Sequence, residues 1–82
     1  MNIERAAMRG KLAQAREKRR RLTSKFEALA SAIRQGLNTA LTEIEDIEIP
    51  QLSEMWGELE VCWGELLILR GDIERLEKEL GN

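Results

Sequence analysis

The feature that most constrains this chain is a seven-residue repeat in its second half. Its three clear copies are Met55-Trp56-Gly57-Glu58-Leu59, Cys62-Trp63-Gly64-Glu65-Leu66 and Leu69-Arg70-Gly71-Asp72-Ile73. A strict seven-residue spacing of apolar side chains places them along one side of an α-helix, where they need a partner helix to cover them. We call this apolar side the seam, and it predicts a helix that packs against another helix.

The seam runs through the whole of a predicted second helix, over residues 50–80. It consists of two interleaved rows: Leu52, Leu59, Leu66, Ile73 and Leu80, and Met55, Cys62, Leu69 and Leu76. Trp56 and Trp63 lie beside these rows and widen the apolar face to about three positions in seven, a width typical of helical bundles. Pro50 falls in the first turn, where its missing amide hydrogen is tolerated, and Gly81 follows the last turn.

A longer first helix is predicted over residues 3–45. Apolar side chains recur there at steps of three and four residues, from Met8 to Ile44, which is the period of a helix. Gly10 and Gly36 each weaken a helix by about 1 kcal/mol relative to alanine, but the apolar period continues past both.

Together these elements predict an all-α fold, an antiparallel two-helix hairpin that forms a single domain of residues 1–82. A turn at residues 46–49 folds the helices back on each other. Because the first helix is the longer one, residues 1–14 are expected to project beyond the second. Two helices meet along one line and cannot cover so broad an apolar face. Each Leu, Ile or Trp side chain that is buried stabilises the assembly by about 1.5–3 kcal/mol, which favours covering the rest of the face. We therefore expect two copies to dimerise into a four-helix bundle or coiled-coil assembly.

The expected pairing of the two helices follows from the position of the turn. It places Ile33 beside Trp63 and Phe26 beside Arg70. It also sets the basic run Lys18–Arg21 beside three acidic residues near the end of the second helix: Glu74, Glu77 and Glu79. Opposite charges that meet in this way favour antiparallel pairing.

The predicted interface with another chain consists of the seam, the two tryptophans and a row of glycines. Its residues are Leu52, Met55, Trp56, Leu59, Cys62, Trp63, Leu66, Leu69, Ile73, Leu76, Gly57, Gly64 and Gly71. Three glycines inside one helix weaken it by about 3 kcal/mol in total, so the row calls for a reason. Either another helix approaches this side closely, or the glycines are tolerated on a solvated face.

The net charge of −2 hides a division between the two halves of the chain. Residues 1–37 hold ten Lys and Arg against three Glu, whereas residues 38–82 hold three Lys and Arg against twelve Asp and Glu. The basic residues that stand out are Arg16, Lys18, Arg19, Arg20, Arg21 and Lys25. They are interpreted in two ways: as partners of acidic residues within the assembly, or as contacts to nucleic-acid phosphates.

Several classes of function find no support in the composition. The chain has no His or Tyr and a single Cys, so we expect no catalytic, cofactor or metal site. Cys62 is interpreted as a small buried apolar side chain of the seam. The acidic turn is interpreted as a solvated tip rather than a cation site. The N-terminus is polar and the longest apolar run is Leu66–Leu69, which indicates a cytoplasmic protein without a membrane partner.

Three segments carry a resemblance to a group of phage proteins. They are the basic first helix from Arg19 to Asn38, the acidic turn Glu45–Ile49, and the Leu- and Glu-rich end of the second helix, Ile73–Gly81. Over residues 16–81 the chain resembles small early-region proteins of Mu-like phages and prophages. Most of these are uncharacterised, so the resemblance implies a phage origin and no biochemical role.

The sequence therefore predicts a non-enzymatic helical protein that self-associates and binds another protein. For an accessory protein of a phage or prophage, this other protein is a host factor. The alternative is a small nucleic-acid-binding accessory protein that uses the basic first helix. It rests on analogy with Rop-type helical-hairpin dimers, which bind paired RNA loops. Salt separates the two hypotheses, because nucleic-acid binding weakens steeply as salt rises.

Overall fold

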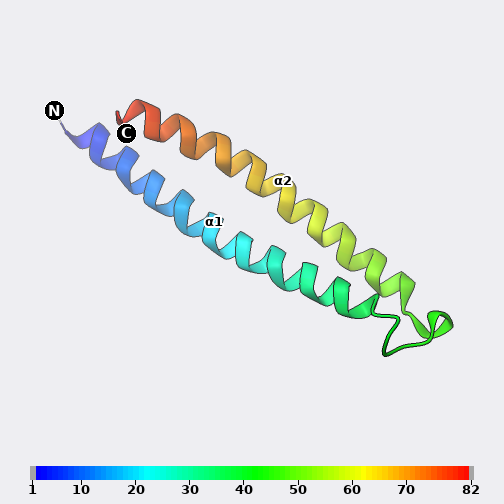
Figure 1. Cartoon of the computed structure of the whole chain (residues 1–82). Helices are drawn as coiled ribbons and strands as arrows, with labels where there is room; N and C mark the ends of the chain where they lie inside the picture. The colour runs from blue at the N-terminus through cyan, green and yellow to red at the C-terminus, as the bar shows by residue number, and fades with distance from the viewer. Residues whose placement is uncertain (1, 82) are drawn as a thin grey trace.

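The computed structural model describes residues 2–81, which form two long helices joined by a loop (Figure 1). Helix α1 spans Ile3–Gly36, a short 3₁₀ helix η1 spans Ile44–Asp46, and α2 spans Ile49–Glu79. The helices run antiparallel side by side, in a molecule that measures 65 × 17 × 15 Å. The predicted all-α hairpin is confirmed. We call the end with both termini the open end and the opposite end the loop end.

Helix α2 has nearly the bounds that the repeat predicts. Pro50 lies in its first turn, where an amide hydrogen would have no partner within the helix. After the last turn Gly81 adopts a φ of 79°, and its N–H donates to the Lys78 carbonyl at 3.1 Å. Only glycine adopts this left-handed conformation without strain, so Gly81 ends the helix as expected.

Helix α1 ends at Gly36, and the prediction that it continues to residue 45 is wrong. Its last turn is followed by Asn38, whose side-chain oxygen accepts a hydrogen bond from the Ala40 N–H at 3.0 Å. Such local bonds compete with helical ones. Leu41 continues the apolar period of α1 but is 85% exposed. Packing therefore gives the helix no support beyond Gly36, and tertiary packing is what stabilises most helices.

The loop end also depends on the absence of a side chain at Gly36. A Cβ atom built there would lie 2.5 Å from Cδ2 of Leu52, closer than any real contact. The first turns of α2 therefore lie directly against the last turn of α1.

The shorter α1 changes the pairing of the two helices. Ile33 packs with Leu52 and Leu59 rather than with Trp63. Phe26 lies with Trp56 and Trp63 rather than with Arg70. A pairing drawn from a turn at residues 46–49 was therefore wrong, because the connection is a loop of residues 37–48.

The expected N-terminal projection of residues 1–14 is likewise absent from the part of it that the structure describes. Leu12 is buried against Ile73, Leu76 and Leu80, and Met8 packs beside it. The Arg5 guanidinium donates to the Leu80 carbonyl at 3.0 Å. The two helices have similar lengths, so their ends meet (Figure 1).

The core of the hairpin is a single line of apolar side chains with a cluster near each end. The open-end cluster consists of Leu12, Ile73, Leu76 and Leu80. The loop-end cluster consists of Ile33, Leu52 and Leu59, with Phe26, Leu29 and Met55 partly buried against it. Between the clusters Cys62 is 2% exposed and its thiol lies 3.1 Å from the Leu22 carbonyl.

Candidate protein interface

Most seam residues of the predicted interface are used inside the hairpin itself. Leu52, Leu59, Cys62, Leu69, Ile73 and Leu76 are buried, and Met55 and Leu66 are half-buried. The contacts are with α1 of the same chain: Leu52 and Leu59 pack with Ile33, Cys62 contacts Leu22, and Ile73 and Leu76 pack with Leu12. The surface that remains for another chain therefore lies beside the seam.

Trp56 and Trp63 do not belong to the core of the hairpin. They are 54% and 57% exposed, and both lie on one side of the seam. With Phe26 of α1 they line a shallow groove between the helices, together with Leu59 and Glu60.

A second depression continues this groove toward the open end. Trp63 lines both parts, and Leu66, Leu67 and Arg70 of α2 line the second part. Helix α1 contributes Arg19 and Thr23 to it. We call the continuous surface of Phe26, Trp56, Glu60, Trp63, Leu67, Arg19 and Arg70 the tryptophan groove.

Helical spacing explains why these side chains share one surface. On α2, Trp56, Glu60, Trp63, Leu67 and Arg70 follow one another at alternating steps of four and three residues, which keeps them on one side of a helix. The two tryptophans were predicted interface residues, whereas Leu67 was missed as their neighbour. The four-residue step from Trp63 to Leu67 was the available indication.

The glycine row lies on the side of α2 that faces away from α1. A Cβ atom added to Gly57, Gly64 or Gly71 would meet no atom within 4 Å. Val61 and Ile68 lie among these glycines and are exposed. Among residues 2–81 no atom comes close enough to require a glycine here, so the close approach of another helix stays a prediction.

The basic run pairs with acidic residues less than predicted. Arg16 contacts Glu77 at 2.7 Å across the helices, and Arg20 contacts Glu17 at 2.7 Å within α1. Within residues 2–81 no ion pair involves the other four basic residues, which are Lys18, Arg19, Arg21 and Lys25. All four are exposed. The predicted pairing of Lys18–Arg21 with Glu74, Glu77 and Glu79 therefore does not form within the described chain.

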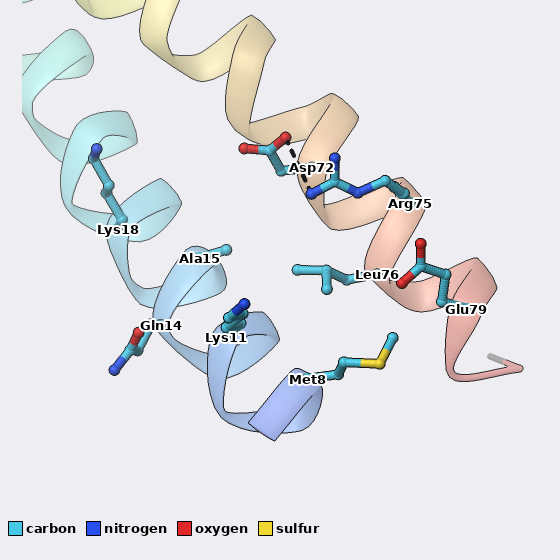
Figure 2. A pocket seen from close by; sticks show the side chains of 9 residues that line it. All are labelled: Met8, Lys11, Gln14, Ala15, Lys18, Asp72, Arg75, Leu76 and Glu79. Carbon is cyan, nitrogen blue, oxygen red and sulfur yellow. Dashed lines mark ion pairs between the residues drawn. The ribbon is translucent and has the colours of Figure 1, made fainter. Parts of the chain in front are cut away.

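A separate depression, outside the tryptophan groove, lies at the open end (Figure 2). Leu76 of α2 points toward Ala15 of α1 at its floor, and Asp72 pairs with Arg75 at 3.7 Å at its rim. The remaining lining residues are Met8, Lys11, Gln14, Lys18 and Glu79. Charges of both signs surround a small apolar floor.

Residues 2–81 show neither a metal site nor a membrane-spanning helix. No group of three or more His, Cys, Asp or Glu side chains is placed to hold a metal ion. Neither described helix combines the length and the apolar character that crossing a membrane requires.

Comparison with known proteins gives no assignment. No family model, no curated protein and no solved structure matches this chain. The resemblance to early-region proteins of Mu-like phages stays a prediction.

Proposed function

We propose that this chain is a non-enzymatic, self-associating helical module for protein–protein interaction, and that two copies dimerise through the tryptophan groove. One observation carries the proposal: Trp56 and Trp63 are more than half exposed beside Phe26 and Leu67. Contiguous apolar surface of this kind marks interfaces in small proteins. Tryptophan also supplies more binding energy at interfaces than most residues.

The narrow core supports self-association. Two helices that meet along one line bury few side chains fully. A chain of 82 residues also buries only a small apolar area when it folds alone, so burial against a second copy adds stability. A second hairpin laid over the groove would cover both tryptophans and build a four-helix bundle. A symmetric pair uses the same patch on both copies.

The proposal includes a second protein as a partner of the dimer. If the chain is a phage accessory protein, this partner is a host factor in the cytoplasm. Val61 and Ile68 support this part, because they are exposed on the side of α2 opposite to α1. A dimer formed through the groove would leave them uncovered.

The test of self-association is the molar mass in solution. The chain mass is 9.4 kDa, so light scattering after size exclusion at micromolar concentration is expected to give twice that value. Replacing both Trp56 and Trp63 with lysine is expected to return the mass to that of one chain, with helicity by circular dichroism retained. The matched control replaces Val61 and Ile68 with lysine and is expected to keep the dimer. A wild-type protein that remains at 9.4 kDa would refute the proposal.

Nucleic-acid binding is the second candidate function, and the unpaired basic residues favour it. Lys18, Arg19, Arg21 and Lys25 are exposed and have no acidic partner among the described residues. Phosphates are the ligands that such residues attract. A gel shift with mixed RNA and DNA at two salt concentrations tests this. Absence of a shift at low salt would eliminate the candidate.

A further inference from the structure

The tryptophan groove carries opposite charges at its two ends. Glu60 lines the part that begins with Trp56, on the side of the loop end. Arg19 and Arg70 line the part nearer the open end. Trp63 lines both parts and lies between the two charges.

The whole hairpin repeats this separation on a larger scale. The contact between Cys62 and Leu22 divides it into two halves. The loop half, residues 23–62, holds two basic and eight acidic residues, a net charge of −6. The open half, residues 2–22 and 63–81, holds eleven basic and seven acidic residues, a net charge of +4. The charges expected to cancel side by side are therefore separated along the 65 Å axis.

We propose that the second copy in the dimer lies antiparallel across the tryptophan groove, with Glu60 of each copy against Arg70 and Arg19 of the other. The proposal rests on the self-association proposed above. Its geometry follows from spacing along α2: Glu60 lies three residues before Trp63, and Arg70 lies three residues after Leu67. A twofold axis that brings Trp63 opposite Leu67 of the other copy therefore also brings Glu60 opposite Arg70.

A parallel arrangement would place like charges together. Glu60 would lie near Glu60 of the other copy, and the two basic open ends would lie side by side. Charges farther apart than about 8 Å are screened at physiological salt, so the pairs at the groove decide the orientation. The charges at the two ends act earlier, because they steer the approach of the copies.

A charge exchange tests the orientation. Glu60→Arg alone and Arg70→Glu alone are each expected to raise the dimer Kd about tenfold, because twofold symmetry turns two attractive pairs into two repulsive ones. The double variant is expected to recover most of this loss, to within about threefold of wild type. The pairs between positions 60 and 70 re-form with reversed signs, and only the contact of position 60 with the unchanged Arg19 stays repulsive. Sedimentation equilibrium measures all four proteins. In a parallel dimer the double variant would gain nothing over the single ones, and that result would overturn the proposal.

A distance measurement provides an independent test. A spin label is attached at Thr39→Cys in the loop, in a Cys62→Ala background that removes the buried thiol. In the antiparallel dimer the two labels are expected at opposite ends, separated by most of the 65 Å length. Adjacent labels in a protein of dimer mass would overturn the orientation alone. A monomer mass for the unlabelled wild type would overturn the self-association as well, so the two failures are distinguishable.

Discussion

The two ends of the hairpin hold the same pair of helices together by different means. At the open end four buried side chains are joined by two polar contacts between the helices, Arg5 to Leu80 and Arg16 to Glu77. At the loop end three buried side chains and the close approach of Leu52 to Gly36 hold the helices. No polar side-chain contact joins α1 to α2 there, within the described residues. The difference indicates that the loop of residues 37–48, which joins the helices covalently, takes the place of polar contacts between them. At the open end, where no loop joins the helices, such contacts are present.

The largest expected effect comes from truncating the open-end cluster. Leu12→Ala removes a side chain that is 4% exposed and is expected to lower the free energy of unfolding by about 2–5 kcal/mol. Ile33→Ala at the loop end is expected to lower it less, because Ile33 is less buried and the loop keeps the helices together. Urea unfolding followed by circular dichroism compares the two. Equal losses would mean that the ends do not differ.

The two glycines of α1 sharpen the comparison, because alanine at each is expected to change stability in opposite directions. Gly36→Ala is expected to destabilise the hairpin by about 1 kcal/mol, because displacing the buried Leu52 side chain outweighs the helix propensity that alanine adds. Gly10→Ala meets no atom within 4 Å and is expected to stabilise α1 by about 1 kcal/mol. Thermal unfolding of both variants at equal concentration measures the difference. A stabilising Gly36→Ala would contradict the close approach.

A smaller effect is expected from the ion pair at the open end. Arg16 and Glu77 are 49% and 36% exposed, so the pair is expected to contribute about 0.5 kcal/mol, less at high salt. A double-mutant cycle of Arg16→Ala and Glu77→Ala isolates this coupling energy. A coupling above about 2 kcal/mol would show that the pair holds the open end as strongly as the apolar cluster does.

The smallest effect concerns a pair that joins neither end. The hydrogen bond from Arg20 lowers the pKa of Glu17. Because the pKa is lowered in the folded state, the pair contributes above the unfolded-state pKa, and the contribution is lost as pH falls through the folded-state pKa. NMR titration is expected to show Glu17 protonating at lower pH than in an Arg20→Gln variant. Identical titration curves would mean that this hydrogen bond is not formed in solution.

The architecture was predictable because its determinants are periodic. The seam defined α2, and Pro50 and Gly81 marked its bounds within a residue or two. Helix α1 was predicted nine residues too long, because Leu37, Leu41 and Ile44 continue the apolar period. The period states which side chains would share a face, but not whether a second helix lies there to cover them. The stop signal in the sequence is Gly36 followed by Asn38, and it interrupts the helix although the apolar period continues.

The surface was less predictable than the fold. Which seam residues are buried depends on the spacing of apolar residues along one helix, and this spacing can be read from the sequence. The environment of Trp56 and Trp63 depends on the register between two helices, and that register moved when the loop replaced the last turns of α1. The same shift left Lys18 and Arg19 without the acidic partners expected for them.

Cys62 is a native probe of local opening between the two helices. Its sulfur is sealed at the midpoint between the two helices, and it is the only cysteine in the sequence. An alkylating reagent can reach the sulfur only when the helices part at their middle, where neither end cluster holds them. The rate at which Cys62 is alkylated therefore rises with the fraction of molecules in which the helices are separated at this point, and no label has to be introduced.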